Sequence, residues 1–353
     1  MRTFRSDNNA GLCPEAMAAL IEANDGVHRI GYGDDELTAA AVDAFRDLFG
    51  PDTAVFFVAT GTAGNLLAAA SLLEPWEEVI CHHFSHFNED ESTGPERIAH
   101  CRVVTLTSAD GSSRMSPDDL RRAARKSRGD VHQPQPGLVT FTNATEMGEV
   151  YTPEETRELC TTARELGYRV HLDGARFANA VAALDCDPRE LANDAGVDAL
   201  TFGGTKNGLA NSEAVLFFPQ GDGSAYRRAV HAFPYHRKAT GHLLSKHRFT
   251  SAPLAATLRD GIWLRHAAHA NAMAALLADG LRELGLELAA PVQANEIFAH
   301  FPDAVHAALQ KAGHAYYPVS DPAKRLYRLV ASFDTQPEDV AALLADAKAA
   351  MGR

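Results

Sequence analysis

Long apolar runs, paired cysteines and an excess of basic residues are all missing from this sequence of 353 residues. No run approaches the roughly 18 consecutive apolar residues that cross a bilayer, and the segment Met1 to Asp7 lacks the apolar core of a secretion signal. The five cysteines are odd in number, scattered and never in a CxxC pair, which argues against a disulfide framework and a zinc knuckle. We therefore expect a cytoplasmic protein without a membrane span or a metal site.

The charge balance argues against a nucleic-acid partner. Asp and Glu outnumber Lys and Arg by 46 to 33, for a formal net charge of -13, whereas phosphate backbones attract clustered basic residues. Hydrophobic residues make up 46% and charged residues 22%, close to globular averages. The length favours a large domain with a smaller one, and we expect the large one, with the N-terminal segment, over 1–250 and a small α+β domain over 251–353.

Short apolar runs alternate with helical patterns between Ala54 and Phe218, which is typical of an α/β fold with a mostly parallel sheet. The expected strands are Ala54–Ala59, Val79–Cys81, Val103–Thr107, Leu138–Thr142, Tyr168–Leu172, Leu200–Phe202 and Ala214–Phe218, and the expected helices are Leu66–Leu73, Pro117–Lys126, Pro153–Leu166 and Phe177–Leu184. Ser116 and Thr152 each precede a proline and are expected to cap their helices.

The chain changes character beyond Pro219. Long Ala- and Leu-rich stretches lie around Tyr226 to Lys246 and Ala252 to Leu284. After them we expect the strand Glu296–Phe301, the helix Ala304–Ala312, the strand Arg328–Phe333 and the helix Pro337–Met351, which together form the small domain.

Asp173 follows an apolar strand and precedes Gly174. Because ligands of open α/β sheets bind at the carboxyl ends of the strands, an acid at this place faces a cofactor crevice. The alternative is that Asp173 only caps the next helix.

Lys206 follows the Gly203-Gly204 turn at the end of another strand. A lysine held partly desolvated in a tight turn can attack a carbonyl, although lone surface lysines are common. One helix and one strand separate it from Asp173, which brings both to one sheet edge. An acid for a pyridine nitrogen and a lysine for an aldehyde are what pyridoxal phosphate requires of a protein.

The turn Gly61-Thr62-Ala63 connects a strand to a helix. Small residues at a helix N-terminus let backbone N–H groups approach a phosphate, although such turns also occur without a ligand. The turn matches neither the P-loop nor the GxGxxG pattern.

In combination these motifs resemble the low-specificity L-threonine aldolases, members of the β-eliminating lyase group of fold type I pyridoxal-phosphate enzymes. The motifs that carry the likeness are Ala59-Thr60-Gly61-Thr62-Ala63, His171-Leu172-Asp173-Gly174-Ala175-Arg176 and Phe202-Gly203-Gly204-Thr205-Lys206-Asn207-Gly208. The likeness runs over nearly the whole chain, from Ser6-Asp7 to Asp334-Thr335.

The resemblance implies a role for each matching residue. Lys206 would form the Schiff base, Asp173 would pair with the pyridine nitrogen, and His86 would stack on the cofactor ring. The phosphate cup would include Gly61, Thr62, Ala63 and Thr205, and the substrate carboxylate would bind Ser6, Arg176 and Arg328. The family is usually built as a dimer of dimers with shared active sites, so Lys238, and less firmly Lys246, would reach the phosphate of a neighbouring subunit.

Two further segments leave alternatives open. His132 resembles a second active-site histidine near the substrate hydroxyl, or is an ordinary solvated histidine. The acidic segment from Phe87 to Glu96 departs from the common threonine aldolases and resembles the branch with phenylserine aldolases. An acid there either orients His86 or belongs to a solvated loop.

The implied reaction is retro-aldol cleavage of a β-hydroxy-α-amino acid to glycine and an aldehyde. The catalytic base would be His86, His132 or a water held by them. The alternatives are another lyase, a transaldolase or a racemase of the same cofactor group, and a protein of this fold used for binding or regulation.

Overall fold

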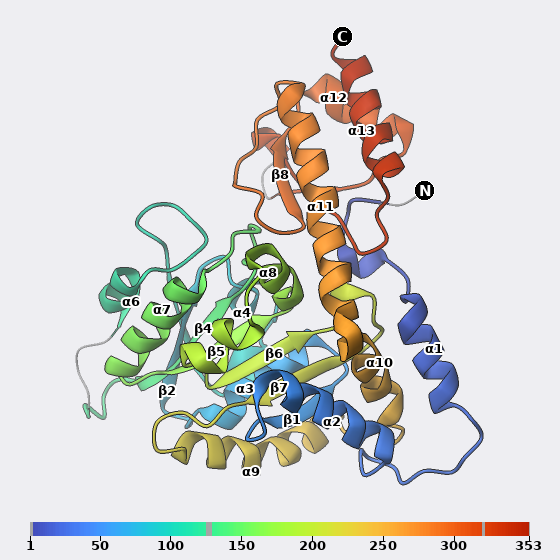
Figure 1. Ribbon diagram of the computed structural model, residues 1–353. Helices are drawn as coiled ribbons and strands as arrows, with labels where there is room; N and C mark the ends of the chain where they lie inside the picture. The colour runs from blue at the N-terminus through green and yellow to red at the C-terminus, as the bar shows by residue number, and fades with distance from the viewer. Residues whose placement is uncertain (1–2, 125–128, 320–321, 353) are drawn as a thin grey trace.

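A seven-stranded sheet forms the centre of the computed structural model, which describes residues 3–124, 129–319 and 322–352 (Figure 1). The strands are β1 Ala54–Val58, β2 Glu77–His82, β3 Arg102–Leu106, β4 Gln135–Thr142, β5 Arg169–Gly174, β6 Ala199–Gly203 and β7 Glu213–Phe217. Their order is β1-β7-β6-β5-β4-β2-β3; only β7 runs antiparallel to its neighbours, and the other paired strands are parallel. The predicted α/β fold with a mostly parallel sheet is confirmed.

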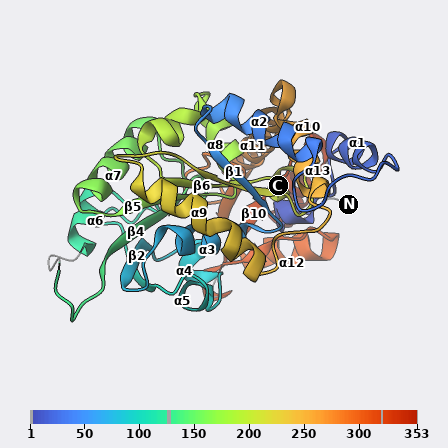
Figure 2. The same ribbon diagram turned by 90° about the horizontal axis from the view of Figure 1, so that it is seen from below.

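Helices cover both faces of this sheet (Figure 2). The N-terminal ones are α1 Pro14–Ala23, α2 Glu36–Phe49, α3 Gly61–Leu72, α4 His86–Glu89, α5 Gly94–Arg97, α6 Pro117–Ala123, α7 Pro153–Glu165 and α8 Phe177–Leu184. The later ones are α9 Ser224–Ala239, α10 Arg248–Leu258, α11 Ile262–Glu283, α12 Asp303–Ala312 and α13 Pro337–Ala350. Short 3-10 turns are η1 Asp7–Asn9, η2 Pro188–Leu191, η3 Asn193–Ala195, η4 Thr205–Asn207, η5 Arg259–Gly261 and η6 Pro322–Lys324.

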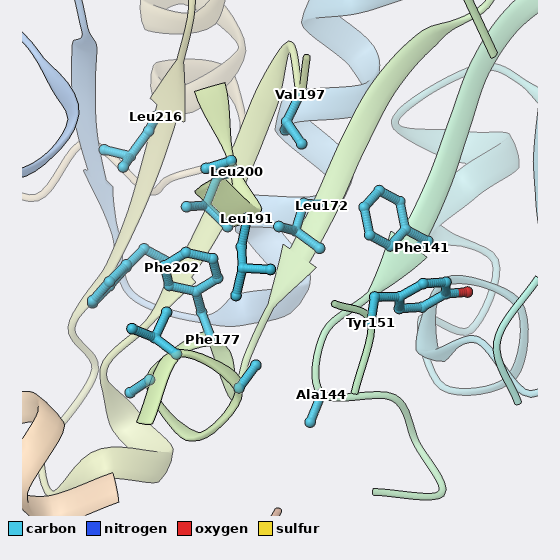
Figure 3. Close-up of a cluster of buried hydrophobic side chains, with 14 of the residues drawn as sticks. Phe141, Ala144, Tyr151, Leu172, Phe177, Leu191, Val197, Leu200, Phe202 and Leu216 are labelled. Atoms are coloured by element: carbon cyan, nitrogen blue, oxygen red, sulfur yellow. The ribbon is translucent and has the colours of Figure 1, made fainter. Parts of the chain in front are cut away.

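Successive residues of a strand are buried in core clusters on opposite faces of the sheet. Leu200 and Leu216 pack in one cluster, drawn in Figure 3 with Phe202 and Leu172, whereas Ala199 belongs to the cluster on the α3 and α9 face. Side chains alternate across a strand, so a sheet covered on both faces needs apolar residues at nearly every position. This is why the strands read as continuous apolar runs.

The two expected helix starts are confirmed. The hydroxyl groups of Ser116 and Thr152 accept the backbone N–H of the third helical residue, and the acid at that position bonds back, which completes a capping box in α6 and α7. The helix expected over Pro117–Lys126 ends at Ala123, and Lys126 lies outside the described residues.

A second, three-stranded antiparallel sheet has the order β8-β10-β9, with bounds Glu296–His300, Leu326–Val330 and Tyr317–Pro318. Its core joins α11, α12 and α13 and includes Phe4. The Phe4 N–H donates to the Ala315 carbonyl at 2.9 Å, and its carbonyl accepts from the Val330 N–H at 2.9 Å. The N-terminal segment is thus attached to this smaller sheet; the boundary between 250 and 251 stays a prediction.

The long stretches after Pro219 are interrupted helices. The first ends at Ala239, and Gly241 follows with a φ of 82°. The second is broken between α10 and α11, where Asp260 and Gly261 have φ values of 54° and 65°. Asp and Gly tolerate this left-handed backbone, which ends a helix. No helix within the described ranges is long and apolar enough to span a membrane.

Candidate active site

The carboxyl ends of the parallel strands meet at one edge of the large sheet, and most of the predicted site lies there. Gly61 follows β1, and His86 lies shortly after β2. Asp173 is the second-last residue of β5, and Lys206 follows β6. Glu213 begins the antiparallel β7 at the same edge, opposite Gly203. The fold therefore gathers residues that are far apart in the sequence, at the place where α/β sheets bind ligands.

Lys206 is half-buried in the turn η4, which directly follows Gly203 and Gly204. A Cβ atom on Gly204 would collide with the Ser212 carbonyl oxygen, so only glycine fits there. The Glu213 carboxylate fixes the turn by accepting the Gly204 N–H at 3.0 Å and the Thr205 N–H at 3.3 Å. Burial raises the pKa of Glu213, although these N–H groups and Lys206 act against the rise.

Asp173 is buried and accepts hydrogen bonds from neutral donors. Its Oδ1 accepts the Ala175 N–H at 2.9 Å, and its Oδ2 accepts the side-chain amide of Asn65 at 2.7 Å. No lysine or arginine in the described ranges forms an ion pair with it. Since Arg176 is the N-cap of α8, Asp173 does not cap that helix. A buried carboxylate without a cationic partner suits a protonated ring nitrogen.

His86 contacts two acids from different segments. Its Nδ1 lies 2.9 Å from Oε1 of Glu91, and its backbone N–H donates to Glu146 at 2.8 Å. Burial lowers the pKa of His86, but the Glu91 hydrogen bond and the nearby Asp173 charge outweigh it, so the pKa is raised above its usual value. About a third of the side chain remains exposed.

The acidic segment after His86 contains two kinds of residue. Glu89 and Asp90 are exposed, as a solvated loop predicts, whereas Glu91 is 3% exposed and bonded to the imidazole. Glu91 therefore fits the alternative in which an acid of this segment contacts His86, and Glu89 and Asp90 fit the alternative of a solvated loop.

Glu146 lies after β4, beside this group. It also accepts the Thr142 hydroxyl at 2.7 Å. Burial raises its pKa, while the hydrogen bonds from Thr142 and the His86 N–H act against the rise. It adds a further carboxyl group at the carboxyl edge of the sheet.

Arg176 is buried between two carboxylates. Its Nε donates to Asp7 Oδ2 at 2.8 Å, its Nη2 to Asp7 Oδ1 at 3.1 Å, and its Nη1 lies 3.2 Å from Glu296 Oε2. Burial acts to raise the pKa of Asp7, but Arg176 and Lys206 outweigh it and lower the pKa. Burial raises the pKa of Glu296 despite Arg176.

Arg328 lies on the other side of Glu296. Its Nη1 is 4.0 Å from Glu296 Oε1, its guanidinium packs against the Tyr317 ring at 5.8 Å, and 31% of its side chain is exposed. Ser6 caps η1 by accepting the Asn8 N–H at 3.2 Å. The three predicted carboxylate binders, Ser6, Arg176 and Arg328, are thus connected through Asp7 and Glu296.

The predicted phosphate turn begins α3. The Thr60 hydroxyl caps the helix by accepting the Ala63 N–H at 3.2 Å, and the Ala59 N–H donates to Nδ1 of His242 at 3.4 Å. A pocket of about 130 Å³ lies here, and Thr62, Ala63 and Thr240 are among the residues that line it. The helix N-terminus supplies the partial positive charge that favours an anion.

Lys238 and Lys246 are both exposed. Lys238 lies in the last turn of α9, with its Nζ 5.2 Å from the centre of the Tyr32 ring. Their expected role is in a neighbouring subunit, so it stays a prediction.

His132 does not lie with the other predicted residues. It is exposed, in the turn that enters β4, and its N–H donates to Asp130 at 3.0 Å. The other site residues are at the opposite end of β4, roughly 20 Å away at the usual rise of a strand. His132 preceded its strand in the sequence, and residues ahead of a parallel strand enter at its amino end.

Several polar residues at this edge were not predicted from the sequence as site residues, namely Asp7, Asn65, Glu146, Glu213 and Glu296. Glu213 and Glu296 carried a weak signal, since each is an acid at the boundary of an apolar strand. Asn65 lies inside an apolar helix and gave no signal of its own.

The fold and this edge define the class of the protein. A mostly parallel seven-stranded sheet, with a lysine, an acid and a histidine at its carboxyl edge and a smaller sheet beside it, is the architecture of fold type I pyridoxal-phosphate-dependent enzymes. Serine palmitoyltransferase from Sphingomonas wittichii shares the fold, with a TM-score of 0.70 over 99% of this chain and 86% of its own at 18% identity.

The chain belongs to the β-eliminating lyase family, whose model matches residues 3–304. It is 44% identical to a low-specificity L-threonine aldolase from a Pseudomonas species. The 349 matched residues cover 99% of this chain and 97% of the relative. The solved threonine aldolase of Leishmania major is 27% identical, with a TM-score of 0.90 over 99% of both chains. The resemblance inferred from the motifs is confirmed.

Proposed function

We propose that the chain is a pyridoxal-phosphate-dependent aldehyde-lyase that cleaves a β-hydroxy-α-amino acid, such as L-threonine, L-allo-threonine or L-phenylserine, to glycine and an aldehyde. The observation that carries the proposal is the meeting of Lys206, Asp173 and His86 at one sheet edge beside Arg176 and Arg328, in a chain similar to threonine aldolases over its whole length. We place the enzyme in the cytoplasm.

The residues present fit the cofactor. Asp173 is a buried carboxylate whose hydrogen bonds come from neutral donors, so a protonated ring nitrogen would supply its missing counter-charge. Lys206 Nζ would hold the aldehyde carbon, and the N-terminus of α3 at Gly61, Thr62 and Ala63, with Thr205, would hold the phosphate. When bound, the cofactor supplies an electron sink for the pair released from the broken bond.

The substrate carboxylate would bind between Ser6, Arg176 and Arg328. Arg328 is the more available arginine, because its Nε is buried without a partner and its nearest carboxylate is 4.0 Å away. Arg176 already contacts Asp7 and Glu296, and it would provide guanidinium N–H donors at the buried end of this group.

His86 would accept the proton of the substrate β-hydroxyl, directly or through a bound water, as the Cα–Cβ bond breaks. Asp173, ionised, would keep the ring nitrogen protonated. The Cβ fragment leaves as the aldehyde, and a proton added at Cα completes glycine. His132 is left out of the proposed site because it lies at the other end of β4.

The quaternary structure is also a proposal: a homo-oligomer, a dimer of dimers, in which Lys238 reaches the site of a neighbouring subunit. Lys238 is exposed in the last turn of α9, where a second copy of the chain can contact it. Lys246 is the second candidate for this contact.

The test is aldehyde release from L-threonine, L-allo-threonine and L-phenylserine in parallel, with the absorption spectrum of the purified protein. We expect a yellow protein, aldehyde from at least one substrate, and loss of both the band and the activity in Lys206→Ala. A colourless protein that ignores added cofactor contradicts the cofactor assignment. Exchange of the α-proton without aldehyde points to another lyase, a transaldolase or a racemase.

A further inference from the structure

The side chains of four residues form a continuous hydrogen-bonded path that runs from Asp173 through Asn65 and Glu91 to His86. The Asn65 side-chain amide donates to Asp173 Oδ2 at 2.7 Å and to Glu91 Oε1 at 3.0 Å, and the same Glu91 oxygen lies 2.9 Å from His86 Nδ1. Asn65 belongs to α3, His86 to α4 and Asp173 to β5, and Glu91 follows α4. The path thus connects separate elements.

Both middle members of the path are shielded from water. Glu91 is 3% and Asn65 is 2% exposed, and Asn65 presents its amide donors to two carboxylates. A buried carboxylate needs hydrogen bonds or an opposite charge to offset its lost hydration; this Glu91 oxygen accepts from Asn65 and contacts His86 Nδ1.

The path determines where the imidazole carries its hydrogen. An ionised carboxylate is only an acceptor, so the nitrogen facing Glu91 must be the donor. A neutral His86 therefore has its hydrogen on Nδ1 and its lone pair on Nε2, the nitrogen on the far side of the ring.

We propose that Glu91, held by Asn65, is a positioning residue that fixes the tautomer and orientation of His86 so that Nε2 is the proton acceptor in the aldol cleavage. The same amide ties this arrangement to Asp173, the carboxylate assigned to the ring nitrogen. The inference rests on the proposed function, because that function gives His86 a proton to accept.

The charges around His86 set the direction of the effect. Glu91 faces its ring from the segment after α4, Glu146 its backbone from the loop after β4, Asp173 from β5 and Lys206 from η4. Glu91 provides the hydrogen bond that raises the pKa, Asp173 acts in the same direction, and Lys206 acts against both. Glu91→Gln removes one negative charge and leaves the other three groups, so His86 should titrate at lower pH.

The test is a histidine NMR titration of the apoenzyme and of the cofactor-loaded enzyme labelled with ¹⁵N-histidine, with His86 assigned from His86→Gln. In the wild type the ring nitrogen shifts should show the hydrogen on Nδ1. In Glu91→Gln the midpoint should move to lower pH, whereas Glu89→Gln, the same change at an exposed neighbour, should leave it unmoved.

Kinetics provide the second readout. In Glu91→Gln the acidic limb of kcat/KM should follow the His86 midpoint, with kcat lowered about 10-fold or more and KM nearly constant, since general base catalysis contributes roughly 100-fold or more. If Glu91→Gln does not fold, Asn65→Ala serves, because it frees Glu91 and should also move the His86 midpoint. Circular dichroism and thermal unfolding show which variants are folded.

An unmoved His86 midpoint in a folded Glu91→Gln protein, or a hydrogen on Nε2 in the wild type, overturns the inference. These results are separable from failure of the proposed function. The NMR titration of the apoenzyme needs no turnover and tests the tautomer and the role of Glu91 by itself. The absence of aldehyde from the wild type would remove the aldolase assignment and the proton that Nε2 accepts, but not the effect of Glu91 on His86.

Discussion

Arg176 and Arg328 differ in electrostatic setting, although both are assigned to the same substrate group. Arg176 is 8% exposed and contacts two carboxylates, so it is largely neutralised before any substrate binds. Arg328 is partly exposed and lies 4.0 Å from Glu296. A substrate carboxylate gains more from Arg328, because less competing negative charge surrounds it.

Arg328→Lys should therefore raise KM about 10- to 100-fold while kcat changes little, because a lysine keeps the charge but loses the bidentate planar contact. Steady-state kinetics with L-threonine measure both constants. Arg325→Lys is the matched control, since Arg325 pairs with Asp303 on the surface. A fall in kcat at constant KM would instead place Arg328 in the chemical step.

His132→Asn should leave kcat/KM unchanged, because its exposed turn lies at the amino end of β4. His86→Asn, the same substitution at the carboxyl edge, should lower kcat/KM about 100-fold or more by removing a general base. Parallel assays of the two variants decide between the two histidines. A large loss in His132→Asn would show that His132 reaches a site in another subunit.

Glu213 makes the stability of the apoprotein depend on pH. Its folded-state pKa is raised, so between its unfolded and folded pKa values the folded protein binds more protons, and stability falls as pH rises through this range. Glu213→Gln removes the titration and keeps an acceptor for the Gly204 N–H. Urea unfolding should show the stability of this variant, relative to wild type, increasing from pH 5 to pH 8. A difference constant with pH would show that the Glu213 pKa is not raised.

Helix starts are the elements that sequence chemistry specified best. Thr152 caps α7 through its hydroxyl, so Thr152→Ala should lower the free energy of unfolding by about 1 kcal/mol. Thr161, an exposed threonine within the same helix, is the matched control, and Thr161→Ala should be neutral or slightly stabilising because alanine favours a helix. Chemical denaturation measures both. Equal losses would mean that the cap contributes nothing.

Other element boundaries depend on partners that a local pattern does not contain. The apolar run predicted that β4 begins at Leu138, but the strand begins at Gln135. The Gln135 N–H donates to the Trp76 carbonyl, and Gln135 pairs with Glu77 of β2. Gln135, Pro136 and Gly137 are not apolar strand formers, so the sequence pattern does not reveal this pairing. Similarly, Asp260 and Gly261 divide a stretch whose alanine and leucine content reads as continuous.

The sheet edge was predictable at the scale of the molecule because parallel strands place their carboxyl ends together. Lys206, Asp173 and Gly61 follow from that rule alone, and His86 required the family resemblance. Glu91 and its neighbours did not follow, because whether an acid is buried beside an imidazole depends on how α3 packs against the segment after α4.

Shared active sites can be tested by mixing subunits. Lys206→Ala removes the cofactor lysine and Lys238→Ala removes the proposed contribution to a neighbour, so each homo-oligomer should be inactive or weakened. If the two lysines act across an interface, a hybrid dimer contains one intact site, and co-refolded mixtures should regain up to about a quarter of wild-type activity. No recovery, or an active monomer in solution, would contradict the role of Lys238.

The N-terminal segment contacts both the small sheet and the site residues beside the large sheet. Phe4 pairs with Val330 of the small sheet, and three residues later Asp7 bonds to Arg176 beside the large one. A substitution that disturbs the pairing of Phe4 should therefore also disturb the contact of Asp7 with Arg176, and with it substrate affinity.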